Sequence, residues 1–294
     1  MSVTTRPVQR ESLVVRRFHP DLQAVPRHWF SGSALLTHAM NAQNLIFPEA
    51  ERFFIRSVHA HFDQVIDPAQ RATVRQFIGQ EAQHGRSHEQ ALDLLRSQGF
   101  HIDGWLSRYR KSIHHFERIA PARLCLSVTA AAEHFTARIA ECWLTEGRMD
   151  QVPPEMAAML GWHAAEEIEH KAVAFDVLQI VDARWGLRVL GAVLAALFLL
   201  TLLVSATASL LWQDPDATGS RLVQERQAAG KENIRATRFI ERHMAPYLAR
   251  DFHPNDRDNL HIARRYLDQI AARFDVRPPI SGGDEPPAGH KPAC

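Results

Sequence analysis

Hydrophobic positions along most of this chain recur at intervals of three and four residues, which is the period of an amphipathic α-helix. In the stretch 68–97, for example, Val74, Phe77, Leu92 and Leu95 fall on one helical stripe. Strand-like alternation of apolar and polar residues is hard to find, and no internal repeat is evident. The pattern therefore predicts an all-α fold.

Prolines divide the first two thirds of the chain into four predicted helices, which begin near Pro48, Pro68, Pro121 and Pro154. After residue 276 the sequence is rich in proline and glycine, a composition typical of disorder. The predicted organisation is an irregular lead-in (1–30), a four-helix core (31–183), a long apolar helix (187–213), a C-terminal helical region packed on the core (221–276) and a disordered tail (277–294).

The apolar segment stands apart from the rest, because residues 189–213 contain no charge. Such a helix can cross the roughly 30 Å hydrocarbon core of a bilayer. Arg184 and Arg188 precede it, and Asp214 and Asp216 follow, which favours an anchor on the cytoplasmic side of the inner membrane. Two alternatives stay open: a helix buried in a cytoplasmic protein, and a seam between the subunits of a homodimer.

Composition excludes several classes of protein. The 34 basic and 33 acidic residues give a net charge of +1, so we expect no nucleic-acid partner. The three cysteines are odd in number and show no C-x-x-C spacing, which argues against a disulfide framework and against a thiolate zinc site. A reducing compartment is therefore expected for the part of the chain that carries the cysteines.

Three polar residues interrupt the apolar stripe of the predicted second helix. Glu81, His84 and His88 are separated by three and four positions, so their side chains lie on the face where apolar residues are expected. An unpaired polar group in a protein interior costs about 1–3 kcal/mol. We therefore expect these side chains to meet partners in the core.

A second E-x-x-H motif, Glu167 and His170, lies in the predicted fourth helix. Each motif is preceded by a lone glutamate on an apolar helical face: Glu51 comes 30 residues before Glu81, and Glu133 comes 34 residues before Glu167. The order Glu, E-x-x-H, Glu, E-x-x-H is the ligand pattern of dinuclear carboxylate bundles. A pair of metal ions would neutralise inward carboxylates that otherwise repel one another.

The stretches "FPEAERFF", "GQEAQHGRSHEQ", "AAEHFTA" and "WHAAEEIEHKAVAFDV" resemble the ferritin-like di-iron carboxylate superfamily. Over roughly residues 30–275 they are more closely similar to a bacterial family labelled predicted metal-dependent hydrolase. The resemblance implies a ferritin-like four-helix bundle that binds two iron ions, with manganese or zinc as alternatives. The implied ligands are Glu51, Glu81, His84, Glu133, Glu167 and His170.

Three further polar residues, His88, His163 and Glu166, are close to the predicted ligands. They are candidates for partners that orient a ligand, for additional ligands, or for ordinary hydrogen-bonded core groups. Glu49 is an alternative to Glu51 if the helical phase differs from the one assumed. The same phase assigns Glu169 and Lys171 to a solvated face.

Three functions fit these features. The leading hypothesis is an oxidoreductase or oxygenase that uses O2 on a small or lipophilic substrate, with electrons from a reductase. The alternative is a metal-dependent hydrolase that uses a metal-activated water. His84 and His88 have the spacing of zinc-hydrolase ligands, but Gly85 takes the place of the catalytic glutamate of H-E-x-x-H. Non-catalytic metal binding is the third interpretation.

Overall fold

The computed structural model describes residues 13–228 and 244–276, and the regular structure within these ranges is helical. The predicted all-α fold is thereby confirmed. Its core elements are α1 (Ala34–His59), α2 (Pro68–Ser97), α4 (Ala122–Thr145), α5 (Pro154–His170) and α6 (Val173–Val181).

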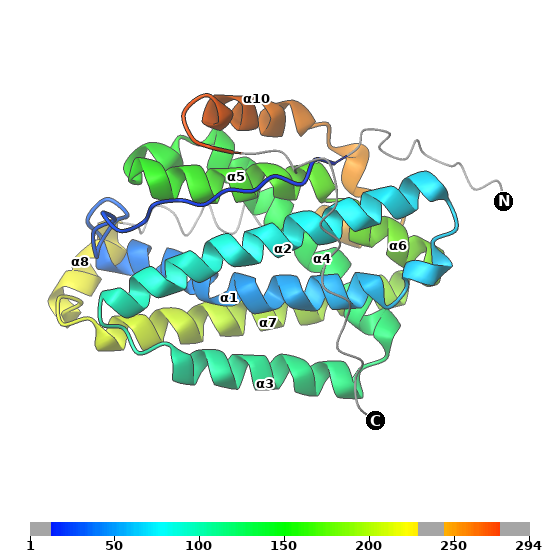
Figure 1. Ribbon diagram of the computed structural model, residues 1–294. Helices are drawn as coiled ribbons and strands as arrows, with labels where there is room; N and C mark the ends of the chain where they lie inside the picture. Colours follow the sequence, from blue (N-terminus) through cyan, green and yellow to red (C-terminus); the bar gives the residue numbers. More distant parts are fainter. Residues whose placement is uncertain (1–12, 229–243, 277–294) are drawn as a thin grey trace.

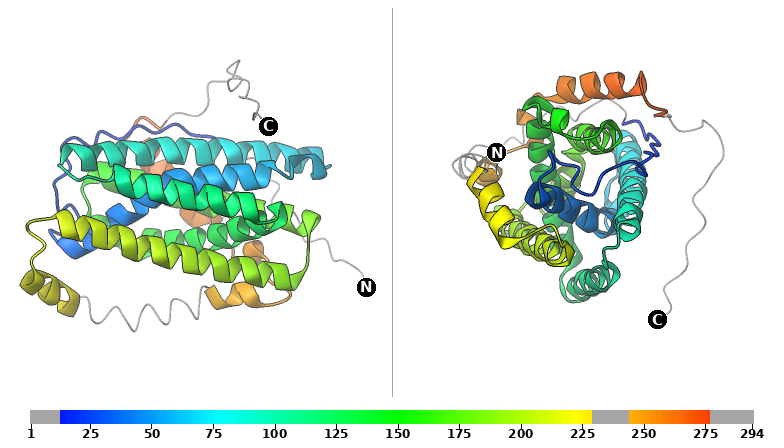
Figure 2. Two further views of the ribbon diagram at one scale, coloured as in Figure 1. Left: turned by 90° about the horizontal axis from the view of Figure 1, so that it is seen from below. Right: turned by 90° about the vertical axis from the view of Figure 1, so that its left-hand side faces the viewer.

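These elements form a four-membered bundle, in which α5 and α6 follow each other as one member. Helix α1 packs along α2, and α4 packs along both α5 and α6, while α2 meets α5 and α6 across the centre. Figure 1 shows the long axes of α1 and α2 side by side, and the right-hand view of Figure 2 looks along the bundle. The bundle therefore encloses one central space lined by four helical members.

Further helices surround this core. Helix α7 (Trp185–Gln213) packs against α1 and α4, and α3 (Asp103–Ile119) lies beside α1 and α7 at the bottom of Figure 1. Helix α10 (Leu260–Ala271) crosses α5 on the opposite side, and α8 (Gly219–Ala228) contacts α1. Parts of the predicted C-terminal region (229–243) and the whole predicted tail (277–294) lie outside the described residues.

Helix α2 begins and ends at the residues that the sequence indicates. The Asp67 carboxylate accepts a hydrogen bond from the Gln70 amide, and Pro68 occupies the first turn, where its missing N–H costs nothing. The helix ends before Gly99, whose φ of 89° lies in the left-handed region that glycine adopts without strain. These signals fix the length of the helix that carries the first E-x-x-H motif.

The predicted start of the first helix was wrong. Helix α1 begins at Ala34, so Pro48 lies inside it and removes one backbone hydrogen bond, that to Asn44. The start is stabilised by Ser33, whose hydroxyl accepts from the Leu36 amide. Glu225 of α8 accepts from the Leu35 amide as well, and its charge suits a helix N-terminus. This second cap comes from 190 positions away, so local sequence does not reveal it.

The predicted fourth helix is interrupted directly after His170. Helix α5 ends there, residues 171 and 172 form a turn, and α6 continues from Val173. Lys171 was assigned to a solvated face, but it is buried and donates to the Arg257 carbonyl at 2.6 Å. The turn therefore directs Lys171 away from the bundle axis and toward the segment before α10.

Helix α7 is long and apolar enough to cross a membrane, yet only 22% of its most apolar window is buried. The interpretation of this segment as a fully buried core helix is therefore wrong. One face contacts the bundle from Gly191, which packs on Ser127, to Leu210. The opposite face is exposed.

Candidate metal centre

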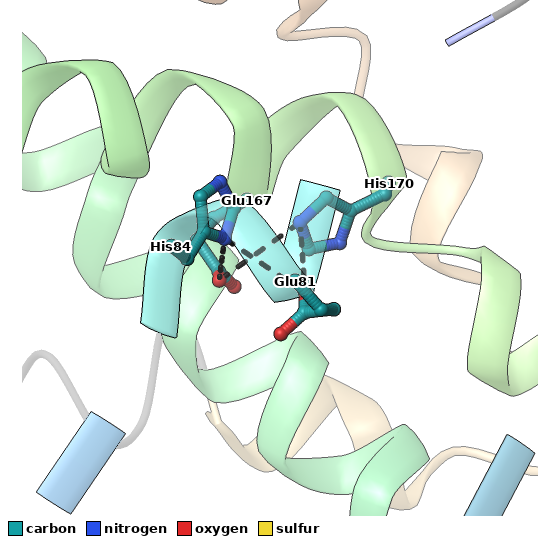
Figure 3. A group of neighbouring side chains, drawn as sticks. All are labelled: Glu81, His84, Glu167 and His170. Atoms are coloured by element: carbon teal, nitrogen blue, oxygen red, sulfur yellow. Dashed lines mark ion pairs between the residues drawn. The ribbon is translucent and has the colours of Figure 1, made fainter. Parts of the chain in front are cut away.

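Four side chains from α2 and α5 converge in the centre of the bundle. Glu81, His84, Glu167 and His170 each place one candidate ligand atom within 4.8 Å of the others, and all four are buried. Figure 3 shows them pointing toward one another. His170 Nε2 lies 3.2 Å from Glu81 Oε1, and His84 Nδ1 lies 4.0 Å from both Glu81 Oε1 and Glu167 Oε1.

The two lone glutamates join this cluster from α1 and α4. Glu133 Oε2 is 2.9 Å from His170 Nδ1, and Glu51 Oε1 is 3.8 Å from His163 Nε2. Glu51 Oε2 faces Gly85, where an added Cβ would lie 3.0 Å from that oxygen. The alternative residue, Glu49, instead contacts arginines outside the cluster. The structure thus brings all six residues named from the sequence into one buried group.

Several atoms of this group have no hydrogen-bond partner although they are fully buried. They are both carboxylate oxygens of Glu51, both of Glu81, Oε1 of Glu133, Nδ1 of His84 and Nε2 of His170. Each is an atom that binds metal ions, and an unpaired buried polar atom is costly otherwise. The donor set therefore fits bound metal, with oxygen and imidazole nitrogen as ligands.

Burial and mutual repulsion oppose the charged forms of this cluster in the absence of metal. Burial, and then the neighbouring carboxylates, raise the pKa of Glu51, Glu81 and Glu133 well above the ordinary range. Burial, and then nearby imidazoles, lower the pKa of His84 well below its usual value. Glu167 differs: burial raises its pKa, but the hydrogen bond from His163, the positive charge of His170 and His163, and the hydrogen bond from Thr136 together lower it. Protonated carboxyls and neutral imidazoles therefore stabilise the metal-free cluster.

A comparison with known families gives an independent indication. A family model described as "predicted metal-dependent hydrolase" matches residues 14–258. The chain belongs to this family. No curated protein and no solved structure matches it. The metal dependence in the family's description agrees with the buried histidine and glutamate groups that could hold a metal ion.

Within the matched range, Glu166 contacts the cluster through His84. His84 Nε2 lies 3.0 Å from Glu166 Oε2, so the opposite nitrogen, Nδ1, faces the centre. Glu166 Oε1 accepts from Arg16 at 2.9 Å and from Trp162 at 3.0 Å. Burial raises the pKa of Glu166 to about 8, against the lowering effect of Arg16. A ligand at His84 Nδ1 requires the proton on Nε2, and Glu166 Oε2 is then the oxygen that accepts it.

His163 and His88 form a hydrogen-bonded pair beside Glu167. His163 Nε2 is 2.8 Å from Glu167 Oε1, and its Nδ1 is 2.6 Å from His88 Nε2. His88 Nδ1 in turn contacts the Asn44 side-chain oxygen at 2.9 Å. An ionised Glu167 only accepts hydrogen bonds, so His163 carries a proton on Nε2. Together with Glu51, these two histidines form a second group that could hold a metal ion.

Sequence reasoning missed four residues that contact this centre. Arg16 lies in the predicted irregular lead-in, and its guanidinium also donates to Glu169 at 2.8 Å, which removes Glu169 from the solvated face predicted for it. The sequence around Trp162 and Asn44 does not indicate that they contact the centre. Thr136 could have been found, because it follows Glu133 by three positions on the same helical face.

A third group that could hold a metal ion lies at the end of α7 and has a different character. Asp214 Oδ2 is 2.7 Å from Nε2 of both His28 and His38, and Oδ1 accepts from Arg27 at 3.2 Å. Both carboxylate oxygens are thus hydrogen-bonded, unlike those of Glu51 and Glu81. We interpret this group as a structural hydrogen-bond network that connects the N-terminal segment and α1 to the end of α7.

Proposed function

We propose that this chain is an enzyme whose buried cluster holds two metal ions, with hydrolysis as its reaction. The observation that carries the proposal is the set of unpaired buried oxygen and nitrogen atoms on five of the six residues, from α1, α2, α4 and α5. The family's description supports metal-dependent hydrolysis. The E, E-x-x-H order supports a ferritin-like dinuclear arrangement of the ligands.

The distances suggest how the ligands are divided. Both histidines lie within 4.0 Å of Glu81 and Glu167, so these two carboxylates would hold metal together with either histidine. His170 and Glu133 are in contact, so we assign them to one ion. His84 and Glu51 are assigned to the other.

For hydrolysis, two metal ions would supply a water activated for attack at neutral pH and would polarise the substrate's carbonyl or phosphoryl oxygen. The protein's own residues prepare the site for this chemistry. His163 holds Glu167 through a hydrogen bond, and Glu166 with Arg16 fixes the orientation of His84. Phe47 stacks on His88 and meets His163 edge to face, and Phe77 meets His170 edge to face; both phenyl rings exclude bulk water.

Oxidation of a substrate by O2 is the second candidate. The observation that favours it is the donor set itself: four carboxylates and two imidazoles suit iron or manganese, which change oxidation state during such reactions. Iron would supply electrons to O2 in this case, and an external reductase would restore them. The protein's residues would bind and orient as described for hydrolysis.

Metal loading under controlled atmosphere separates the two candidates. Protein freed of metal should be loaded anaerobically with zinc, manganese or ferrous iron, and binding counted by elemental analysis; we expect close to two ions per chain. Hydrolysis of aryl and alkyl esters under argon by any loaded form supports the hydrolase. If the ferrous form takes up O2 and no form hydrolyses esters, the oxidase replaces the hydrolase as the proposed function. Less than one bound ion with every metal would overturn the dinuclear proposal.

A further inference from the structure

Two apolar cavities lie against the candidate metal centre. Each has a volume of about 100 Å³, and both are bordered by Ile46, Phe47, Thr136 and Leu199. Both are partly open to the surface, and pockets lined by apolar side chains take up apolar groups. The shared border makes the two cavities neighbours along one path.

One end of this path reaches the cluster. His163 and Glu167 form part of the wall of one cavity, and they are its only wall residues that belong to the candidate centre as described above. The other cavity extends to Phe116 and Phe198, and its walls are apolar apart from Thr136 and Tyr109. A ligand that fills both cavities must therefore be mostly apolar along its length, and it meets a carboxylate and an imidazole only at the end near Glu167 and His163.

Helix α7 supplies the outer wall of both cavities. Leu199 borders both, Leu202 the first and Leu203 the second. The opposite face of the same helix carries an exposed stripe with spacing of three and four residues. It consists of Leu190, Val193, Leu197, Leu200 and Val204, which are 47–61% exposed. Only one helix thus separates the cavities from an apolar outer surface.

The surroundings of this stripe match a lipid surface. Trp185 and Trp212 are exposed near the two ends of α7, where tryptophan favours the boundary between lipid and water. Helix α3 lies beside α7 and exposes Arg108, Lys111 and Arg118, which suit anionic headgroups. Because α7 contacts the bundle along its length, it cannot cross a bilayer alone, and its exposed face fits a helix that lies in the membrane surface.

We propose that the outer face of α7 rests on a lipid bilayer and that the two cavities receive the aliphatic chain of a lipid-like substrate. The chain lies along α7 and carries its polar or reactive end to Glu167 and His163. This assignment rests on the proposed function for the reaction, but the binding of the chain does not depend on which reaction follows.

The binding test uses purified full-length protein and a long-chain fatty alcohol with a diazirine in its alkyl tail. After irradiation, mass spectrometry locates the label. We expect it on the inner residues of α7 and on α1 and α4, whether or not metal is bound. Leu199→Trp should fill the shared border and lower labelling about tenfold, whereas Leu200→Trp, one position away on the exposed stripe, should leave it unchanged.

The amount of metal bound per chain and the circular dichroism spectrum show whether each variant folds. If Leu199→Trp does not fold, Leu199→Phe takes its place in the labelling experiment. Equal labelling of the Leu199 and Leu200 variants, or label confined to the surface, would overturn the cavity assignment. Glu81→Gln separates failure of the cavity assignment from failure of the proposed function. This variant should lose metal and activity but keep the same labelling, because Glu81 does not line either cavity.

Flotation with vesicles of phosphatidylcholine and phosphatidylserine tests the membrane surface. Wild type should float with the vesicles, and Leu200→Glu combined with Val204→Glu should abolish flotation while metal content stays unchanged. Analytical ultracentrifugation tests whether a second copy of the chain covers the stripe instead. If wild type does not float and is a dimer that the double variant converts to monomer, the stripe is a subunit interface and the lipid surface is excluded.

Discussion

The two E-x-x-H motifs have the same spacing, yet their histidines turn opposite ring nitrogens toward the cluster. His84 keeps Nδ1 unpaired at the centre and bonds Glu166 through Nε2. His170 leaves Nε2 unpaired, 3.2 Å from Glu81, and bonds Glu133 through Nδ1. The same E-x-x-H spacing has therefore produced two halves of the cluster, one around His84 and one around His170, with different hydrogen-bond partners.

The two histidines differ in the kind of carboxylate that orients each ring. Glu166 lies outside the set of predicted ligands and is fixed by Arg16 and Trp162, so the His84 half is oriented before metal binds. Glu133 is itself a predicted ligand, and only its Oε1 is unpaired. The His170 half must therefore divide one carboxylate between holding the ring and binding metal, and we expect it to rearrange more on loading.

Removing a carboxylate common to both halves should have the largest effect. Glu81→Gln takes away the group that lies near both histidines, so we expect loss of both ions and a decrease in activity of at least about 100-fold. Elemental analysis and turnover measure this. The matched control is Glu89→Gln on the same helix, where Glu89 is half-exposed and pairs with Arg52. Retention of two tightly bound ions by Glu81→Gln would contradict the shared position assigned to it.

Changing the orienting carboxylates separately should distinguish the halves. Glu166→Gln keeps the shape of the side chain but removes the charge that holds His84, so the affinity for one ion should fall about 10–100-fold while the second is bound normally. Glu133→Gln should weaken the other ion. Calorimetric titration with manganese resolves the two steps. Equal weakening of both ions by either variant would show that the halves act as one unit.

The helices and the six converging residues could be predicted from sequence because both depend on spacing within a helix. Glu81 and His84 must share a face whenever residues 68–97 are helical. Arg16 could not be predicted, because it reaches Glu166 across 150 positions and no local pattern records that contact. The start of α1 was missed for the same reason, since part of its cap comes from Glu225.

The choice of ring nitrogen at His84 and His170 was also beyond the sequence. An E-x-x-H spacing sets which face of the helix carries the imidazole, but the ring turns toward whichever acceptor packing provides. That acceptor is Glu166 for one ring and Glu133 for the other, and both come from other helices. Tertiary contacts therefore decide the difference between the halves.

The stability of the metal-free protein should decrease as pH rises above 7. Four carboxylates have raised pKa values in the folded state, so they keep protons that the unfolded chain releases above about pH 4.3; they are Glu51, Glu81, Glu133 and Glu166. Their contribution to stability is complete below the unfolded pKa and is lost as pH rises toward the folded pKa. The buried histidines act in the opposite sense, but only below about pH 6.5, where the unfolded imidazoles become charged.

Urea unfolding at pH 7, 8 and 9 measures this effect in protein treated with chelator. The expected loss is at most about 1.4 kcal/mol per pH unit for each proton retained. Metal-loaded protein should show little dependence over the same range, because its carboxylates have already lost their protons to allow binding. Lys171, whose pKa is lowered to about 8 by burial, acts in the opposite sense above about pH 8. No loss of stability between pH 7 and 8 in the metal-free protein would therefore show that the cluster is ionised without metal.

The smallest effect is expected at Thr136, which contacts a carboxylate that lies near both histidines. Its hydroxyl is a hydrogen-bond partner of Glu167, and its side chain also borders both cavities. Thr136→Val keeps the branched shape and removes the hydroxyl, which contacts Glu167 and also the Ala132 and Glu133 carbonyls of its own helix. Losing one such bond costs about 1 kcal/mol, which corresponds to a roughly fivefold lower metal affinity.

Thr145→Val provides the control on the same helix, because the Thr145 hydroxyl donates only to the Glu141 carbonyl. Metal titration of both variants should separate the local hydrogen bond from a general effect on α4. Glu167 lies near both histidines, so the loss at Thr136 should spread over both ions and leave their ratio of affinities unchanged. A loss confined to one ion would instead assign Glu167 to that half, and the two halves would then differ in their ligands as well as in the groups that orient them.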